Sequence, residues 1–393
     1  MAASLAAGGI LAGSLPAWAT NLVQMPFANG GRKLVRFPEK REMLLLRERP
    51  PLLETPFAVF DNGVFTPNDL FFVRWHLSAI PTVIDVKSFR LRIDGHVRTP
   101  VELTLDELLR QPVVELAAVN QCSGNSRGFS SPRVPGGEWG NGAMGNARWS
   151  GVTLKSLLDR VGVLPGAVQV RFRGLDFGEM PETPVFMKSL SIDHAMDGEV
   201  MVAYAMNGAQ FPLLNGFPLR LVVPGWYSTY WVKMLSHIEV LDQPDDNFWM
   251  RSAYLIPDTP GATTTPDAKG VKMVPINRMV PRSFITNLRE GMAARRGAPL
   301  KVRGIAFGGD TGVKRVAFSS DGGSSWQNAE LGQDYGRYSF RRWQTSFVPQ
   351  RRGSYKLMVN ATNSNNLSQP TTPTWNAGGY MRNVIEQVTL HAA

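Results

Sequence analysis

The chain of 393 residues contains a single cysteine, Cys122. One thiol cannot form an internal disulfide, a cysteine-rich zinc site or an iron–sulfur cluster, and it cannot attach a c-type haem covalently. With 43% hydrophobic residues, the chain is instead long enough to bury a sizeable core in two or three domains. A redox function would therefore need a non-iron cofactor or a separate protein that takes the electrons.

Composition narrows the fold class and the kinds of partner. The 38 glycines and 28 prolines favour short strands joined by many turns over long helical bundles. The formal charge is +10, but no run of five or more basic residues occurs, so we expect no nucleic-acid partner. A basic surface suits a small dianion or an acidic electron-transfer partner.

Residues 1–19 form the one long apolar stretch, which ends in Ala17-Trp18-Ala19, a pattern typical of a signal-peptide cleavage site. Because a charged region should precede such a stretch, we interpret it as a truncated export signal that lacks its upstream arginines. This predicts a periplasmic protein exported by the twin-arginine route. The alternative is a short buried N-terminal helix. We expect no membrane span in the mature protein.

The rest of the chain divides into four segments. Residues 20–55 are basic and are interpreted as an N-terminal arm laid over the surface. Residues 56–250 alternate short apolar strands with loops, which is typical of an α+β domain. Residues 251–285 are interpreted as a covering segment and linker, and residues 286–393 as a separate β domain.

Local patterns predict the elements of the α+β domain. Thr104 and Thr153 are plausible N-caps for short helices over residues 105–109 and 154–161. The expected strands include Phe89–Ile93, Val168–Phe172, Met201–Ala205 and Leu219–Val223.

The C-terminal segment carries strand-like pieces separated by turns that contain glycine. The sequence Ser320-Asp321-Gly322-Gly323 predicts a hairpin turn. Five or more short strands in about 100 residues indicate an antiparallel, immunoglobulin-like β-sandwich. The expected strands are Leu300–Phe307, Val313–Ser319, Ser324–Glu330, Arg341–Phe347 and Ser354–Ala361.

Cys122 lies in the polar, glycine-containing loop NQCSGNSR (120–127), directly after the apolar residues 113–119. A lone cysteine is usually a small buried hydrophobic residue. Here the neighbours are polar, and Arg127 favours the thiolate, which is the form that binds metals. Both interpretations remain open on these residues alone.

Two further stretches favour an anion site. In FFVRWH (71–76), Arg74 and His76 share one face of an extended segment while Val73 and Trp75 face the other way. In residues 215–233, a strand that ends in Pro-Gly is followed by aromatic residues and Lys233, which suits a large anionic cofactor. The alternatives are a structural histidine and a strand edge with solvated charges.

Together these stretches, with SSDGGSSW (319–326) and WNAGGY (375–380), resemble the sulfite oxidase family, in particular bacterial periplasmic sulfite dehydrogenases without a haem domain. The resemblance covers roughly residues 55–390. It implies that residues 56–250 are a molybdopterin-binding catalytic domain and residues 286–393 a dimerisation domain. It also implies a molybdenum–molybdopterin cofactor with one pterin dithiolene, whose metal is bound by Cys122.

The resemblance assigns expected roles by position. Arg74, Arg127 and Tyr254 match the anion pocket, with His76 as a further orienting donor and Cys122 as the metal ligand. Arg220 and Lys233 would suit a phosphate, and Asp176 the pterin ring nitrogens. Asn215 stands where vertebrate enzymes have a histidine. The expected cofactor-binding residues are Phe72, Val73, Arg74, Trp75, His76, Cys122, Asp176, Asn215, Arg220, Trp231, Val232 and Lys233.

The implied activity is oxidation of sulfite to sulfate by oxygen-atom transfer, with electrons leaving singly to an external c-type cytochrome. A homodimer or a complex with a haem subunit is expected, and no haem in this chain. The first alternative is a molybdopterin-dependent sulfoxide reductase, which the pocket arginines disfavour because a neutral sulfoxide does not need their charge. The second is a secreted binding protein with a vestigial molybdenum domain.

Overall fold

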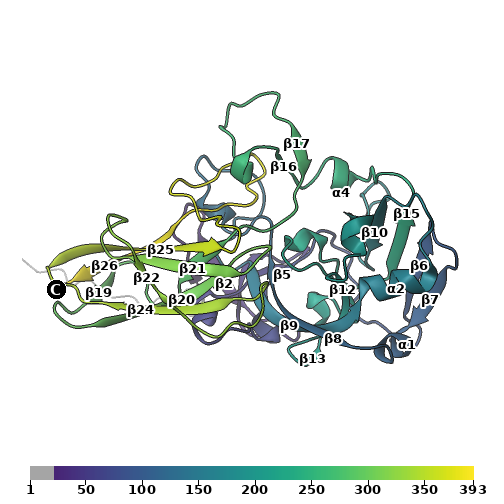
Figure 1. Ribbon diagram of the computed structural model, residues 1–393, viewed down its shortest axis with the longest axis horizontal. Coiled ribbons are helices and arrows are strands. Elements are labelled where there is room, and N and C mark those ends of the chain that lie inside the picture. Colours follow the sequence, from purple (N-terminus) through teal and green to yellow (C-terminus); the bar gives the residue numbers. More distant parts are fainter. Residues whose placement is uncertain (1–21) are drawn as a thin grey trace, which may run out of the picture.

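The computed structural model describes residues 22–393, so the expected signal at residues 1–19 lies outside the described residues. Figure 1 shows an α+β part on the right, an elongated β-sandwich on the left, and a small hairpin that projects between them. The prediction of an α+β domain followed by a β-sandwich is therefore confirmed.

The N-terminal segment is a sheet rather than an arm laid over the surface. Four strands pair antiparallel with one another and, through β4, with the strand that contains Arg74. The expectation of an arm was wrong because these strands bury one apolar face. That face packs in a small core of Met43, Leu53, Val73, Trp75 and Met234. The strands are β1 (Leu22–Gln24), β2 (Gly31–Val35), β3 (Met43–Arg47), β4 (Leu52–Glu54) and β5 (Val73–Arg74).

Two five-stranded sheets build the α+β part. The first has the order β11-β10-β15-β6-β7, in which only β15 and β6 are parallel. The second has the order β13-β12-β9-β8, with β14 paired to β12. The four strands predicted here are found within two residues at either end. The strands are β6 (Arg90–Gly95), β7 (Val101–Thr104), β8 (Val114–Gln121), β9 (Met144–Thr153), β10 (Gln169–Arg173), β11 (Met187–Ser191), β12 (Met201–Met206), β13 (Ala209–Gln210), β14 (Arg220–Val222) and β15 (His237–Leu241).

The helices are short, and the two predicted ones are found with their predicted caps. Thr104 forms a capping box with Glu107 at α1 (Leu105–Leu109), and Thr153 caps α2 (Leu154–Val161). Within the described residues, no helix has the length and apolar character to cross a bilayer. The other helices are α3 (Ile192–Ala195) and α4 (Phe248–Arg251), and short 3₁₀ turns cover Phe57–Asp61, Asn68–Leu70, Arg127–Phe129, Leu213–Asn215, Ser228–Tyr230 and Pro260–Ala262.

The predicted covering segment contains the projecting hairpin, β16 (Leu255–Pro257) and β17 (Met273–Pro275), and the sandwich already begins at Arg282. One predicted strand, Ser324–Glu330, is split because the chain crosses from one sheet to the other at the buried Ala329. The hairpin turn before it is confirmed. One pair, β19 with β26, is parallel, so the sandwich is not wholly antiparallel. One sheet contains β18 (Arg282–Ile285), β20 (Leu300–Phe307), β24 (Arg341–Phe347) and β23 (Glu330–Leu331); the other contains β19 (Met292–Ala294), β26 (Glu386–Ala392), β25 (Gly353–Asn363), β21 (Val313–Ser319) and β22 (Gln327–Asn328).

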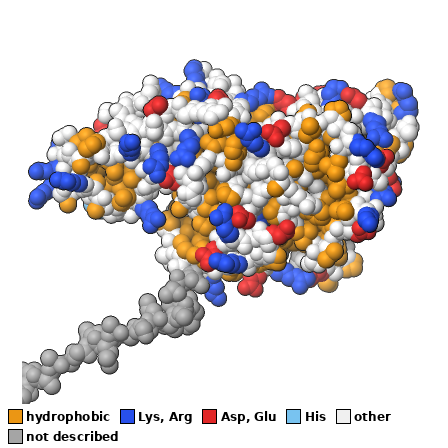
Figure 2. Space-filling view, turned by 90° about the horizontal axis from the view of Figure 1, so that it is seen from below, with side chains coloured by type: hydrophobic (Ala, Val, Ile, Leu, Met, Phe, Trp, Pro, Cys, Tyr) orange, Lys and Arg blue, Asp and Glu red, His pale blue; other side chains and the backbone are white. Residues whose placement is uncertain are grey.

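The surface charge is dispersed on the face that Figure 2 shows. Lys and Arg side chains alternate there with Asp and Glu, and one group of basic side chains lies at the far end of the sandwich. On this face, the net charge of +10 does not form a continuous stripe.

Arg282 joins the sandwich to the loop that contains Cys122. Its side chain is 1% exposed and pairs with Glu386 at 2.5 Å, while Nη1 donates to Ser126 Oγ at 2.9 Å. The guanidinium also lies 4.5 Å from the centre of the Phe284 ring. The position of the loop therefore depends on the sandwich.

We expect Arg282→Met to lower the free energy of unfolding by about 3 kcal/mol, because it removes the buried guanidinium that pairs with Glu386 and donates to Ser126 Oγ. Thermal and urea unfolding would measure this. The control Arg289→Met removes an exposed arginine of the same domain. Equal stability of the two variants would contradict the role of Arg282 in connecting the sandwich to the cysteine loop.

Candidate active site

Cys122 follows directly after β8 and lies where two cavities meet. Its backbone N–H donates to Ala143 O at 2.9 Å, and the residue is 6% exposed. One is a wide outer cavity and the other a narrow inner pocket, and Arg74, Cys122 and Tyr254 line both. The thiol therefore stands at the boundary between the two.

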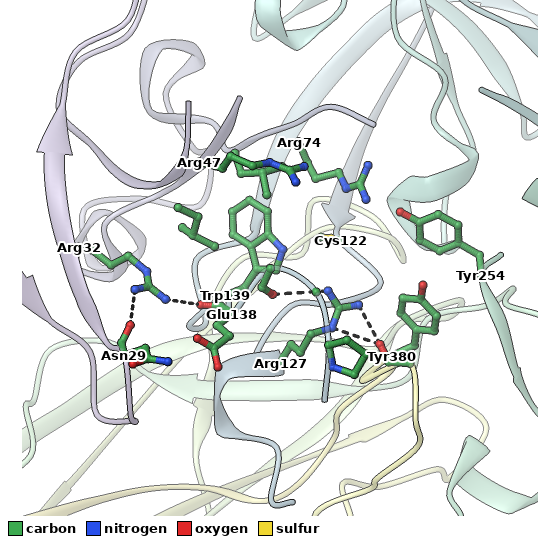
Figure 3. A pocket seen from close by; sticks show the side chains of 17 residues that line it. Asn29, Arg32, Arg47, Arg74, Cys122, Arg127, Glu138, Trp139, Tyr254 and Tyr380 are labelled. Atoms are coloured by element: carbon green, nitrogen blue, oxygen red, sulfur yellow. Dashed lines mark hydrogen bonds between the residues drawn. The ribbon is translucent and has the colours of Figure 1, made fainter. Parts of the chain in front are cut away.

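The outer cavity is wide, with a volume of about 640 Å³. Figure 3 shows its walls, to which three parts of the chain contribute. The N-terminal sheet contributes Asn29, Arg32, Leu46, Arg47, Leu52 and Arg74; the α+β part and the hairpin contribute Cys122, Gly124, Arg127, Pro135, Gly136, Gly137, Glu138, Trp139 and Tyr254; the sandwich domain contributes Gly378 and Tyr380.

Arg127 lies along the wall of the outer cavity in a cradle of glycines. A Cβ on Gly124 would lie 2.6 Å from the guanidinium carbon, and one on Gly136 would lie 2.7 Å from Nη1. Its Nε and Nη2 donate to Gly378 O at 3.2 and 2.9 Å, and Nη1 donates to Gly137 O at 3.4 Å. Backbone carbonyls thus hold the charge of Arg127 in place and use several of its donors.

Glu54 of the N-terminal sheet holds the segment that carries Trp139. Its carboxyl oxygens accept the N–H groups of Gly140 and Gly142 at 2.9 and 2.8 Å. In turn, Gly140 O accepts the N–H of Ser126 at 2.7 Å, next to Arg127. Burial raises the pKa of Glu54 to about 7, although the two backbone N–H groups act in the opposite direction. The N-terminal sheet therefore supports the cysteine loop through the backbone of Gly140.

His76 and Tyr254 form one unit at the junction of the cavities. His76 Nε2 lies 2.5 Å from the Tyr254 hydroxyl, and the imidazole stacks on Phe186 at 3.6 Å. Burial, followed by the charges of Arg74 and Lys233, lowers the pKa of His76 well below its usual value, so the ring is neutral. Tyr254 has a left-handed backbone with φ of 58°, an uncommon conformation that aims its ring towards the cavities.

The inner pocket is narrow, aromatic and basic. Arg220 is 4% exposed, and burial lowers its pKa to about 9. Lys233 Nζ lies 4.4 Å from the centre of the Trp75 ring; burial, with Arg220 as the next cause, lowers its pKa to about 7, while Asp176 raises it. The lining residues are Phe72, Arg74, His76, Cys122, Ser123, Phe186, Arg220, Ser228, Thr229, Trp231, Lys233 and Tyr254.

Comparisons with known proteins identify the family. Residues 76–249 match the family described as oxidoreductase molybdopterin binding domain, and residues 274–393 match the Mo-co oxidoreductase dimerisation domain. The sulfite oxidase of Gallus gallus is 33% identical over 355 residues, which cover 85% of this chain and 74% of that enzyme. The chain belongs to the sulfite oxidase family.

Other relatives share part of their length or their fold with this chain. The mitochondrial sulfite oxidase of Mus musculus is 33% identical over 87% of this chain, and the chain spans 64% of that enzyme's length. The NADH nitrate reductase of Ulva prolifera is 28% identical over 90% of this chain and 44% of that enzyme. The crystal structure of the sulfane dehydrogenase SoxCD from Paracoccus pantotrophus has a TM-score of 0.73 at 23% identity, covering 97% of this chain and 92% of that one, which shows a shared fold.

The inner pocket fits the anionic cofactor of the sulfite oxidase family. Four buried polar atoms of its lining have no hydrogen-bond partner among the described residues: Arg74 Nη1, Ser123 Oγ, Arg220 Nε and Thr229 Oγ1. Buried polar groups without partners are costly, and buried cations more so. A polar anion in this pocket would supply the missing acceptors and neutralise the charge.

Seven of the predicted cofactor-binding residues line the inner pocket, and five lie behind it. Val73 and Trp75 are in the small core under Lys233, as the alternation of FFVRWH predicted, and Val232 and Asp176 are buried outside the lining. Burial raises the pKa of Asp176 to about 6, and Lys233 lowers it. The seven lining residues are Phe72, Arg74, His76, Cys122, Arg220, Trp231 and Lys233.

Asn215 has protein partners at both ends of its amide. Its Oδ1 accepts from Lys40 Nζ, and its Nδ2 donates to Phe72 O at 3.1 Å. The ammonium of Lys40 also donates to Asn68 O at 2.7 Å and to Phe71 O at 3.0 Å. The amide of Asn215 thus links the turn Leu213–Asn215 to Lys40 and to Phe72, and its expected contact with the cofactor stays a prediction.

Several lining residues were not predicted from the sequence. Ser123, Ser228 and Thr229 lie inside motifs that carry the family resemblance, so their hydroxyl groups were a usable signal. Tyr380 lies in WNAGGY, although nothing local shows that this segment reaches the cavity. Arg32, Arg47 and Trp139 have no local signal at all, because strand pairing and loop packing place them there.

We expect Lys40→Met to destabilise the protein by about 2–3 kcal/mol, because two buried acceptors and one partly buried acceptor lose their donor. Burial lowers the pKa of Lys40 from 10.5 to about 7 in the folded protein. Between these pH values the unfolded chain binds more protons, so the contribution of Lys40 to stability increases with pH, by up to about 1.4 kcal/mol per unit.

Urea unfolding at pH 7, 8 and 9 would test this prediction. The difference in unfolding free energy between wild type and Lys40→Met should increase with pH. The control Lys33→Met, which removes an exposed lysine of β2, should show no such trend. A difference for Lys40→Met that stays constant over this range would contradict the prediction.

Proposed function

We propose that the protein oxidises sulfite to sulfate with a molybdenum–molybdopterin cofactor in the inner pocket and sulfite in the outer cavity. One observation carries the proposal: Cys122, the single thiol, lies where a narrow basic pocket opens into a wide basic cavity. A metal ligand at such a junction is in reach of both a buried cofactor and an entering substrate. Curated relatives in the family are sulfite oxidases.

The residues of the inner pocket would hold the cofactor. Arg220 and Lys233 would neutralise its phosphate, and Ser123 and Thr229 would donate hydrogen bonds from hydroxyl groups that lack partners. The Cys122 thiolate would bind the metal. When bound, the cofactor supplies oxygen-atom transfer and accepts the two electrons of sulfite oxidation.

The chain's own residues bind and orient the substrate in the outer cavity. Arg74 lines this cavity with a charged side chain, and Arg127 adds a fixed charge. The Tyr254 hydroxyl, held by neutral His76, is directed to the same space. These positive charges favour a dianion over a neutral sulfoxide, which is why we place sulfite oxidation above sulfoxide reduction.

The remaining parts of the proposal concern the cellular context. We infer that electrons pass singly to an external c-type cytochrome and that the protein acts in the periplasm after twin-arginine export. The C-terminal domain, which matches a dimerisation domain, supports a homodimer, and a complex with a haem subunit is the other assembly to be tested.

We expect Cys122→Ser to reduce sulfite turnover at least about 100-fold, because a hydroxyl does not replace the thiolate as metal ligand. Sulfite-dependent reduction of ferricytochrome c and of ferricyanide would measure this, and the second acceptor removes dependence on the cytochrome. Molybdenum and pterin content would show whether the cofactor is retained. Full sulfite turnover in Cys122→Ser would refute the proposal.

We expect Arg74→Gln to raise the KM for sulfite by about 10- to 100-fold, since it removes a charged hydrogen-bond donor from the cavity. Steady-state kinetics with ferricyanide would measure the change. The control Arg92→Gln removes an exposed arginine of β6 that pairs with Asp94. If both variants keep the wild-type KM, Arg74 does not bind the substrate.

A further inference from the structure

The N-terminal sheet places Arg47 in register with Arg74. Arg47 of β3 lies opposite Leu52 of β4, and Leu52 lies opposite Arg74 of β5. Directly opposed residues of antiparallel strands point to the same face of a sheet. All three residues line the outer cavity, and Figure 3 shows the two arginine side chains along the same wall.

A β-bulge brings Arg47 to this face. The register of β3 and β4 shifts between Leu45 and Arg47, so that Leu46 is an extra residue on β3. Without the shift, Leu46 would lie opposite Leu52 and Arg47 would be displaced from the row. Bulges beside active sites commonly redirect a side chain in this way. The position of Arg47 is thus a specific feature of this sheet.

Arg47 and Arg74 have free donors, in contrast to the other arginines of the cavity. Arg47 uses Nε towards Pro50 O at 3.3 Å, and its two terminal nitrogens have no partner in residues 22–393. Arg32 donates to the carbonyls of Asn29, Gly31 and Glu138. Arg127 donates to the carbonyls of Gly378 and Gly137, as described above.

No carboxylate of the described chain lies within 4 Å of the charged nitrogens of Arg47, Arg74 or Arg127. The acidic residue of the cavity lining, Glu138, pairs instead with Arg133 at 2.6 Å. The pKa of Arg47 is lowered by partial burial and then by the charge of Arg74, which agrees with the nearness of the two guanidinium groups. The charge on this wall is therefore available to an anion.

We propose that Arg47 is a further substrate-binding residue, which together with Arg74 binds the oxygen atoms of the sulfur oxyanion while Arg127 contributes fixed charge. This inference rests on the proposed function. It assigns a substrate-binding role to β3, which lies outside both matched family regions, 76–249 and 274–393. The N-terminal sheet would then set the affinity and the preference for dianions.

The test is the variant Arg47→Gln in the purified, cofactor-containing protein. We expect the KM for sulfite and the inhibition constant of sulfate to rise by about 5- to 20-fold. This effect is smaller than the one expected for Arg74→Gln because the Arg47 side chain is partly solvated. The kcat should change by less than about twofold. The increase of KM with ionic strength should be weaker than in the wild type.

Two further variants separate binding from net charge and from folding. Arg36→Gln removes the same charge from an exposed residue directly after β2 that pairs with Glu42, and it should leave the KM and its salt dependence unchanged. Arg47→Lys should recover part of the affinity because it keeps the charge. Unfolding temperatures close to that of the wild type would show that the sheet is intact.

The outcomes distinguish this inference from the proposed function. If the wild type oxidises sulfite and Arg47→Gln matches Arg36→Gln in KM and in sulfate inhibition, Arg47 does not bind the substrate, although the proposed function stands. If the wild type does not oxidise sulfite, the proposed function fails. Calorimetric titration with sulfate then decides the anion site: weaker binding in Arg47→Gln supports it, and equal binding overturns it.

Discussion

The structure depends on positive charge that is buried around one thiol without matching carboxylates. Arg220 and Lys233 lie in the inner pocket, and Arg74 lies at its mouth. Asp176 is the nearby buried carboxyl that raises the pKa of Lys233. Burying cations without partners costs free energy, so such a site is stable only when the rest of the fold holds it or an anion fills it. Polar contacts of the fold hold these residues, and the proposed cofactor and substrate are anions that would neutralise their charge.

The N-terminal sheet and the sandwich domain hold the cysteine loop through buried and partly buried polar contacts. Glu54 of the N-terminal sheet binds the backbone of Gly140 and Gly142. Arg282 of the sandwich reaches Ser126, and Gly378 accepts two hydrogen bonds from Arg127. A loop of glycine and small polar residues has little packing of its own, so these contacts replace a local hydrophobic core. The sandwich is therefore part of the site as well as the domain that matches a dimerisation family.

Local patterns predicted much of the fold. The caps at Thr104 and Thr153, the alternation of FFVRWH and the strands β20, β21 and β24 depend on neighbouring residues, and these were predicted correctly. The N-terminal sheet was missed because its short strands gain stability only by pairing with each other and with β5. The split of residues 324–330 was missed for a similar reason, since two different sheets compete for one short segment.

The sequence by itself determined that the chain has one thiol, in a polar loop followed by an arginine, and its motifs indicated the family. Only the tertiary structure decided which charges share a cavity. Arg47 and Arg74 are brought together by a bulge and two strand pairings, and Lys40 and Asn215 meet across 175 positions of sequence. The reason is physical: side-chain alternation and capping are local, whereas the proximity of buried charges depends on long-range pairing and packing.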